Sequence, residues 1–291
     1  MAVVATGFFD GVHLGHREVI KTLVSSARER GEEAIAVTFS RHPRTVLQQD
    51  ARGLQLLNSP EEKERLLRAL GVDRVEVLPF DRAFAGMTAA QYLDDILRRR
   101  LGATLLVLGY DNRLGCDRLT PDRIAPLASS MGLEVTVVPP AAVPSGPSPA
   151  TVSSTVIRRL LGEGDVETAG RMLGYPYMLR GVVVGGKQLG RKLGFPTANL
   201  RLYDPMKLIP ARGVYLTGVE VLGRSWWGMT NVGDVIETHI FDFNEDIYGL
   251  DLEIRFRRFL REMRRFESLD ALKAQLAADE AECRRLSVAI F

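Results

Sequence analysis

The stretch Gly7-Phe8-Phe9-Asp10-Gly11-Val12-His13-Leu14-Gly15-His16 follows a short apolar run and precedes apolar residues at helical spacing. This order predicts a strand, a glycine-rich turn and then a helix. The glycines let the backbone approach a ligand closely, and the helix N-terminus offers unpaired N–H groups to an anion. His13 and His16 are two of only four histidines in the chain, and such side chains can donate to a phosphate and stabilise its charge. We interpret the stretch as a nucleotide-phosphate site rather than as a purely structural turn.

Further along the chain, predicted strands at residues 34–39, 74–78, 104–108 and 134–138 alternate with predicted helices that begin near residues 60, 88 and 121. Strands that are apolar on both faces and alternate with helices indicate a parallel α/β sheet. Ligands of such sheets bind beyond the carboxyl ends of the strands. The opening turn, the loop after Phe39 and the loop at residues 109–115 are therefore expected at one edge.

A proline-rich segment at residues 139–150 predicts an irregular exposed loop. It leads to Ser153, Ser154 and Thr155 at a helix start, with Arg158 about one turn further on. Taken alone, these residues suggest an ordinary helix cap beside a solvated arginine. Next to the histidine turn they suggest a second phosphate-binding element, because arginine offers forked donors.

After residue 176 the pattern changes to short β runs, at residues 179–184, 213–221, 226–232, 235–243 and 250–259. Such a run of strands is typical of a small antiparallel barrel. One helix is predicted there, at residues 268–286, with an apolar stripe formed by Leu269, Leu272 and Leu276. We therefore predict two domains, residues 1–176 and 177–291.

The segment at residues 185–199 combines glycines with Lys and Arg, which suits a polyphosphate, and Thr197 and Asn199 offer hard oxygen ligands for Mg²⁺. The alternative is that these glycines only turn a barrel strand. Glu237 and His239 lie on one face of a predicted strand. Glu237 could take a proton from a hydroxyl nucleophile, or both residues could simply face solvent; the sequence leaves this open.

Composition excludes several classes of function. The chain has 291 residues with 46% hydrophobic and 25% charged residues, which is typical of a soluble globular protein. A net charge of +2 gives no argument for nucleic-acid binding, and the arginines at residues 98–100 and 255–265 are interpreted as solvated faces. No membrane span or signal peptide is expected. Cys116 and Cys283 fit neither a disulfide framework nor a zinc site, which favours a reducing cytoplasm.

These motifs, in this order, resemble the bacterial bifunctional riboflavin kinase/FAD synthetase family over essentially the whole chain. The resemblance rests on residues 7–16, 38–43, 152–158, 190–199, 213–215, 237–239 and 246–249. It implies an α/β, Rossmann-like nucleotidylyltransferase domain with a parallel sheet, followed by a small antiparallel β-barrel riboflavin kinase domain with a C-terminal helix. The barrel would phosphorylate riboflavin with Mg·ATP to FMN. The N-terminal domain would transfer AMP from ATP to FMN, giving FAD and pyrophosphate.

The resemblance also implies roles for individual residues. The catalytic residues would be His13, His16, Arg158 and Glu237. The ATP-binding residues would be Gly7, Phe8, Asp10, Gly11, Gly15, Asp111, Ser153, Ser154, Thr155, Gly185, Gly190, Arg191, Pro196, Thr197 and Asn199. The flavin-binding residues would be Phe39, Pro43 and Arg261, and Thr197 and Asn199 would be the Mg²⁺ ligands. The partners would be these small molecules, without nucleic acid or membrane, and a weak homo-oligomer is compatible with the resemblance.

The chain departs from the family pattern at three places. Leu114 stands where the family usually has Phe. Ser40 and Arg41 precede His42 where the family tends to have an apolar or acidic residue and Pro. Only a short segment joins Gly233 to Glu237 where the family has a longer loop. The short segment means either a shortened flap over the site or residues missing from the sequence, and we favour the second explanation.

Two other functions compete with this one. The first is nucleotidylyl transfer to a different acceptor, such as a sugar or lipid phosphate, which the kinase-like barrel argues against. The second is a flavin-binding protein with decayed catalysis, which the intact histidines, Thr197, Asn199 and Glu237 argue against.

Overall fold

The computed structural model describes residues 1–42, 53–143, 150–186 and 189–289. By compactness it divides into two units, Met1–Ser154 and Thr155–Phe291. The predicted domain boundary at residue 176 separates the two expected activities rather than two compact units, and it stays a prediction.

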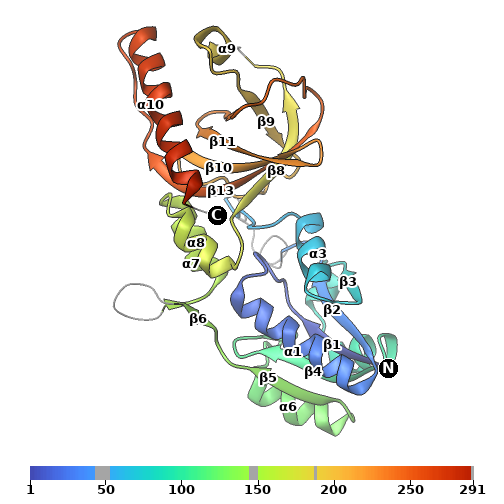
Figure 1. The fold of residues 1–291 in the computed structure, drawn as a ribbon. Coiled ribbons are helices and arrows are strands. Elements are labelled where there is room, and N and C mark those ends of the chain that lie inside the picture. Colours follow the sequence, from blue (N-terminus) through green and yellow to red (C-terminus); the bar gives the residue numbers. More distant parts are fainter. Residues whose placement is uncertain (43–52, 144–149, 187–188, 290–291) are drawn as a thin grey trace. The chain divides into compact units, whose positions relative to one another are not determined.

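The first unit is built on a five-stranded parallel sheet in the order β3-β2-β1-β4-β5, which confirms the predicted α/β architecture (Figure 1). The strands are β1 (Ala2–Thr6), β2 (Glu33–Phe39), β3 (Arg74–Leu78), β4 (Ala103–Gly109) and β5 (Glu134–Val138). The strands that run through its middle are almost fully buried, as expected when helices cover both faces.

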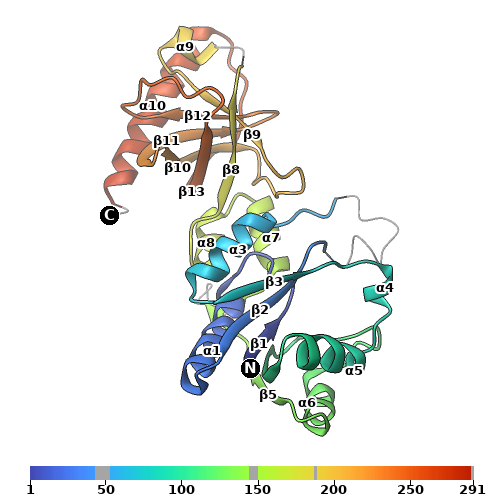
Figure 2. The same cartoon turned by 90° about the vertical axis from the view of Figure 1, so that its right-hand side faces the viewer.

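Helices cover the two faces of this sheet (Figure 2). Alternate residues of β1 point to opposite faces, so Val3 packs into the cluster that contains α1 and α3, and Val4 into the cluster that contains η1 and α6. The helices are α1 (Leu14–Arg30), α3 (Pro60–Ala69), α4 (Arg82–Ala85), α5 (Ala89–Gln91), η1 (Tyr92–Arg100) and α6 (Pro121–Ser130).

Two helices begin where predicted and have side-chain caps, but one of them differs from the expectation further along. Ser59 and Glu62 form the capping box of α3. Thr88 caps α5, as expected, but the helix continues as the π-helix η1, in which the Leu101 N–H donates to the Ile96 carbonyl at 3.1 Å. The hydrophobic spacing of this segment predicts a helix, and one extra residue per turn is too small a change to show in that spacing.

The proline-rich connection contains a short β pairing that the sequence did not suggest. β6 (Ala142–Val143) pairs with β7 (Ala150–Thr151), and residues 144–149 lie outside the described part of the chain. The helical hairpin follows as α7 (Ser154–Gly162) and α8 (Val166–Leu173), with Asp165 as the N-cap of α8.

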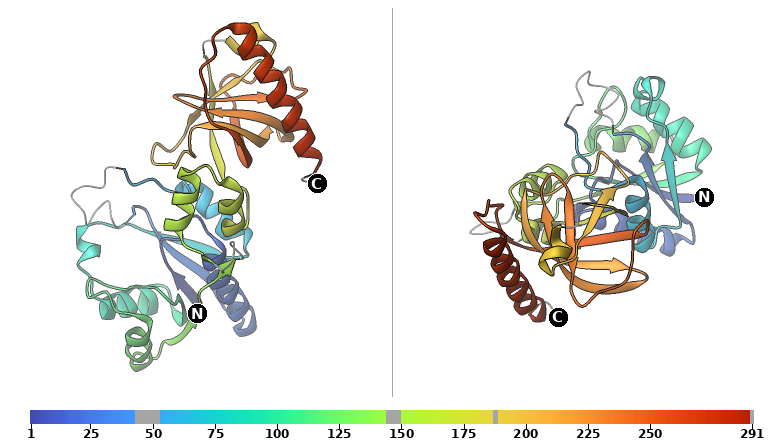
Figure 3. Two further views of the ribbon diagram at one scale, coloured as in Figure 1. Left: turned by 90° about the vertical axis from the view of Figure 1, so that its left-hand side faces the viewer. Right: turned by 90° about the horizontal axis from the view of Figure 1, so that it is seen from above.

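The second unit contains a closed antiparallel barrel in the order β10-β11-β12-β9-β8-β13, as predicted (Figure 3). Its strands are β8 (Met178–Val184), β9 (Ala198–Leu202), β10 (Gly213–Val221), β11 (Arg224–Val232), β12 (Ile236–Ile240) and β13 (Asp251–Arg261). Strand β9 and the short helix α9 (Leu189–Leu193) were not predicted, because their segment was interpreted only as a binding loop. β9 pairs with both β8 and β12 and so closes the barrel.

The barrel interior holds a chain of hydroxyl groups. Thr217, Thr230 and Thr238 are completely buried, and their Oγ1 atoms hydrogen-bond in sequence at 2.8 and 2.9 Å. This chain crosses β10, β11 and β12 and satisfies polar groups that burial would otherwise penalise.

The C-terminal helix α10 (Leu269–Val288) packs on the barrel through Cys283 and Leu286. Leu269, predicted to lie on its apolar stripe, is 58% exposed, because the contact with the barrel is made further along the helix. The short segment after β11 forms a tight turn, in which the Gly233 N–H donates to the Val235 carbonyl at 3.0 Å.

Candidate functional site

The opening turn leaves the carboxyl end of β1, where parallel sheets bind their ligands. Its backbone is tightly wound: Gly11 has a φ of 84°, and Phe9 and Val12 have φ values of 52° and 37°. A positive φ is unusual for Phe and rarer still for a β-branched Val. Strain of this kind persists where the surrounding structure holds it, and it clusters at functional sites.

The two histidines lie at the start of α1. His13 is the N-cap, and its Nδ1 accepts a hydrogen bond from the His16 backbone N–H at 3.3 Å. Since Nδ1 accepts, the neutral ring carries its proton on Nε2. The two rings stack, and the His16 Nδ1 atom is buried without a hydrogen-bond partner among the residues described. The structure therefore brings both predicted donors together.

The pKa of His16 lies well below its ordinary value. Burial is the largest cause, and the neighbouring His13 and Lys63 lower the pKa further. His16 is therefore neutral at physiological pH.

Asp10, predicted to bind ATP, has its carboxylate turned into the protein. Its Oδ1 accepts hydrogen bonds from the backbone N–H groups of Leu57 at 2.9 Å and Asn58 at 3.3 Å. Its backbone carbonyl accepts a hydrogen bond from the Ser154 hydroxyl at 2.9 Å. Asp10 thus ties the turn to the start of α3 and to the start of α7, and a direct contact with ATP stays a prediction.

Lys63 is a residue that the sequence analysis missed. It follows the capping box of α3 and is only 5% exposed. Its Nζ donates to the Phe8 carbonyl at 3.1 Å and lies 4.1 Å from the centre of the Phe8 ring. A lysine in the first turn of a polar helix gives no local signal of burial, so only the tertiary structure could reveal it.

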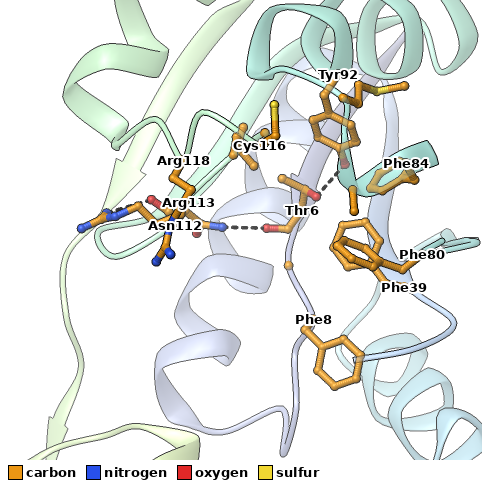
Figure 4. Close-up of a pocket in the computed structure, with 15 residues that line it drawn as sticks. Thr6, Phe8, Phe39, Phe80, Phe84, Tyr92, Asn112, Arg113, Cys116 and Arg118 are labelled. Atoms are coloured by element: carbon orange, nitrogen blue, oxygen red, sulfur yellow. Dashed lines mark hydrogen bonds between the residues drawn. The ribbon is translucent and has the colours of Figure 1, made fainter. Parts of the chain in front are cut away.

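A cavity of about 710 Å³ adjoins the turn (Figure 4). One end is aromatic, since Phe39, Phe80 and Phe84 contact one another at ring-centroid distances of 5.4 to 5.5 Å and Tyr92 contacts Phe84 at 5.8 Å. Of these, only Phe39 was predicted. The lining residues are Thr6, Gly7, Phe8, Phe39, Phe80, Phe84, Ala85, Met87, Tyr92, Asn112, Arg113, Leu114, Gly115, Cys116 and Arg118.

The other end of this cavity is polar. Asn112 accepts a hydrogen bond from the Gly109 N–H at 2.7 Å and donates to the Thr6 carbonyl at 3.1 Å, so it fixes the end of β4 against the end of β1. Asp111, predicted to contact the nucleotide, is exposed and does not line the cavity. Leu114 does line it.

The remaining predictions for this half of the chain are placed as follows. Gly7 and Phe8 line the cavity, whereas Gly11 lies in the turn beside it and Gly15 is the second residue of α1. Ser153 and Ser154 belong to the first compact unit, and Thr155 and Arg158 belong to the second. Their roles at the triphosphate stay predictions. Pro43 lies outside the described residues.

The barrel has a cavity of its own, of about 330 Å³. The predicted residues Arg191, Pro196 and Thr197 line it, together with residues 243–248, which overlap the stretch 246–249 that carries part of the resemblance. Gly190 lies close by, and its lack of a side chain is required, since a Cβ there would stand 2.3 Å from the Phe195 carbonyl oxygen.

A polar row crosses three strands of the barrel. Asn199 on β9 pairs with Glu237 on β12, and Glu237 pairs with Asn231 on β11, so the three side chains share one face. A Cβ on Gly186 would stand 2.3 Å from Asn199 Nδ2, whereas Gly185 faces open space. The Asn231 Oδ1 atom is buried and lacks a hydrogen-bond partner within the described part of the chain. The sequence analysis missed Asn231, because an orphaned buried oxygen is visible only in three dimensions.

His239 is buried, which decides against the solvent-facing alternative for this residue. It is 9% exposed, and its Nδ1 donates to the Pro196 carbonyl at 2.8 Å. Its Nε2 lies 3.8 Å from a carboxylate oxygen of Glu280 on α10. His239 thus connects the loop before Thr197 with the C-terminal helix.

Arg261, predicted to bind flavin, is held by an ion pair. Its guanidinium donates to both carboxylate oxygens of Asp279, with the shortest distance 2.7 Å, and Asp279 is almost fully buried. The pair fastens the end of β13 to α10. A contact between Arg261 and flavin stays a prediction.

Two searches covered the part of the chain that the structure describes. No group of three or more His, Cys, Asp or Glu side chains there could hold a metal ion. No described helix combines the length and the apolar character that a bilayer crossing requires.

Comparisons with known proteins agree with this geometry. The sequence model of the FAD synthetase family matches residues 1–155, and that of the riboflavin kinase family matches residues 173–287. The bifunctional riboflavin kinase/FMN adenylyltransferase of Listeria monocytogenes is 36% identical over 294 residues, covering 97% of this chain and 91% of the relative. The protein of the same name from Escherichia coli is 34% identical over 294 residues, covering 97% of this chain and 91% of the relative.

A solved structure also matches. A crystal structure described as a macrolide-efflux protein from Streptococcus pneumoniae is 34% identical and superposes with a TM-score of 0.88, covering 97% of this chain and 93% of that chain. Both halves of the sequence, the order of the two folds and the full-length relatives point to one conclusion. The chain belongs to the family of bifunctional riboflavin kinase/FMN adenylyltransferases.

Proposed function

We propose that this protein makes FAD from riboflavin in two steps. The barrel transfers a phosphoryl group from ATP to riboflavin, giving FMN, and the parallel-sheet unit transfers AMP from a second ATP to FMN, giving FAD and pyrophosphate. The observation that carries the proposal is that one chain holds a paired-histidine turn beside an aromatic cavity and, in a separate barrel, a carboxylate aligned with Asn199.

In adenylyl transfer, a phosphate oxygen of FMN attacks the α-phosphorus of ATP, and pyrophosphate leaves. The nucleophile is already an anion, so the enzyme needs no base for this step; positioning and charge stabilisation carry the catalysis. We assign to His13 and His16 the donation of hydrogen bonds to the α-phosphate, where negative charge builds up. The helix N-terminus behind them favours the same charge.

The aromatic end of the cavity suits the flavin. The isoalloxazine ring is flat and apolar on its faces, and offset or edge-on contacts with aromatic side chains stabilise such rings. Phe39, Phe80 and Phe84 offer these contacts in a cavity of about 710 Å³, which is within the usual range for small-molecule sites.

In the kinase step, Glu237 takes the proton of the terminal ribityl hydroxyl, whose oxygen attacks the γ-phosphorus of ATP as the bond to the β,γ-bridging oxygen breaks and ADP leaves. Asn231, which pairs with Glu237 across the strands, offers its orphaned oxygen to a substrate hydroxyl donor. Gly190 and Arg191 on α9 and Pro196 in the loop after it would cover the nucleotide, and the 330 Å³ cavity that they adjoin fits part of it.

The donor set in the barrel fits Mg²⁺. The Thr197 hydroxyl and the Asn199 amide oxygen are hard, uncharged ligands, and Mg²⁺ usually combines one or two protein oxygens with water and substrate phosphates. When bound, the ion would neutralise charge on the transferring phosphate. We also propose a cytoplasmic location, which is supported by two free thiols, Cys116 on the surface and Cys283 in the core.

The proposal is tested by incubating the purified chain with riboflavin, ATP and Mg²⁺ and separating the flavins by chromatography. We expect FMN first and FAD second. Glu237→Gln should leave riboflavin unconverted while still turning added FMN into FAD. Failure of the wild-type chain to make FAD from FMN and ATP would overturn the N-terminal assignment, and failure to make FMN would overturn the kinase assignment.

A further inference from the structure

Lys63 is a buried cation beside the histidine turn, and none of the roles assigned above uses it. It is 5% exposed, whereas lysines are almost never this buried without a specific reason. Its ammonium group donates to the Phe8 carbonyl at 3.1 Å and stands over the Phe8 ring. Asp10, in the same turn, is the charge that favours its protonated form.

The hydrogen bond from Lys63 to Phe8 lies next to residues whose backbone conformation is strained. The residue after Phe8 is Phe9, with a φ of 52°, and Val12 has a φ of 37°. A conformation of this kind costs about 1–3 kcal/mol for each residue and needs fixed neighbours to persist. Lys63 donates this hydrogen bond from α3, and the Leu57 N–H, in the segment just before α3, donates to the Asp10 carboxylate.

Lys63 also acts electrostatically on His16. Burial is the main cause of the low pKa of His16, and two charged or titratable neighbours lower that pKa further: His13, at the start of the same helix, and Lys63, from α3. Both are cationic or can become so, and each disfavours a positive charge on His16. An arriving phosphate brings the opposite charge and favours the protonated ring, which is the better hydrogen-bond donor.

We propose that Lys63 is a positioning residue for adenylyl transfer: it fixes the strained turn through its hydrogen bond to the Phe8 carbonyl and places a positive charge near His16. The two effects are linked, because the same ammonium group supplies the hydrogen bond and the charge. Burial lowers the pKa of Lys63 to about 8, which still leaves the group mainly protonated at neutral pH. The inference rests on the proposed FAD synthetase activity of this unit.

The experiment compares Lys63→Met, Lys63→Gln and Lys63→Arg in the full chain. Lys63→Gln keeps a donor but not the charge, and Lys63→Arg keeps both. Lys21→Met, at an exposed position on α1, is the control for loss of one positive charge. For each chain, kcat and KM are measured for FMN-to-FAD conversion, and the pKa of His16 is followed by NMR, which is practical because the chain has only four histidines.

We expect Lys63→Met to lower kcat for FAD formation by about 10²-fold, since misplaced catalytic groups cost this much. Lys63→Gln should lower kcat less, and both variants should raise the pKa of His16. Lys63→Arg should restore most of the rate and the low pKa. Riboflavin phosphorylation, measured in the same samples, should not change.

Rates and a His16 pKa like those of the wild type in Lys63→Met would overturn the inference. If Lys63→Met does not fold, Lys63→Gln decides: an unshifted His16 pKa together with an unchanged rate overturns the inference. A wild-type chain that makes no FAD would instead refute the proposed function, so the two failures are distinguishable.

Discussion

The imidazole rings of His13 and His16 stack almost in parallel, with their centroids 3.6 Å apart and 15° between their planes. Two rings at this distance cannot both carry a positive charge cheaply, because like charges oppose each other in a partly buried site. His16, whose pKa is lowered, is therefore the neutral ring, and an anion bound beside it would favour its protonation.

Replacing His13 by Asn separates its two roles. Asn is a good N-cap, so α1 should keep its start, but the imidazole donor is lost. We expect FAD formation to fall by about 10²–10³-fold, as when one donor to a developing oxyanion is removed. Riboflavin phosphorylation should continue at the wild-type rate. Chromatography of both products in one reaction checks this, and a parallel loss of FMN would contradict the independence of the two sites.

The absence of a side chain at Gly186 leaves room for the side chain of Asn199. A methyl group there would stand 2.3 Å from Asn199 Nδ2, so Gly186→Ala should push that side chain out of the row it forms with Glu237. We expect a loss of riboflavin kinase activity, with a higher KM for Mg·ATP. Gly185→Ala adds the same methyl in open space and should cost clearly less. Equal losses in the two variants would show that loop stiffness, rather than Asn199, is what matters.

The aromatic end of the first cavity should recognise FMN. Phe84 contacts Phe39, Phe80 and Tyr92, and each aromatic pair contributes about 0.5–1.5 kcal/mol beyond burial. Phe84→Leu, which keeps much of the volume without the ring, should weaken FMN binding by about tenfold. Quenching of flavin fluorescence measures the affinity. An unchanged affinity would place the flavin elsewhere.

Acid should destabilise the first unit through His16. The pKa of this group lies well below 6.5 in the folded chain and is expected near 6.5 in the unfolded chain. The unfolded chain then binds more protons as the pH falls below 6.5, so the free energy of unfolding falls with it. His16→Gln should remove this component. Urea unfolding at about pH 7.5 and about pH 5.5 measures it; an identical pH dependence in both chains would contradict the prediction.

The sequence was sufficient for the fold because its strands are apolar on both faces and its helix starts carry recognisable caps, as at Ser59. The sequence did not predict strand β9, because its five residues directly follow a glycine-rich segment. That strand is fixed by pairing with β8 and β12, and strand pairing depends on distant neighbours.

The residues of the candidate sites likewise divide into those that the sequence predicts and those that it does not. His13, His16 and Glu237 stand in motifs, so their positions could be predicted. Phe84 and Asn231 could not, because their significance comes from ring contacts and an unpaired oxygen that only the folded chain creates. Asp10 shows the converse: a residue inside a motif whose carboxylate serves the backbone of another segment.

The hydrogen bonds between threonine hydroxyls inside the barrel also help to fix the register of β12. Thr238 bonds to Thr230, and its neighbour in the chain, Glu237, faces Asn199 from the other side of the same strand. Side chains alternate along a strand, so a slip of one position would bury the carboxylate and expose the hydroxyl. A misaligned β12 is thus penalised twice, by a broken hydrogen-bond chain and by a buried charge. Correct alignment of the Glu237 carboxylate is therefore selected during folding, before any substrate is present.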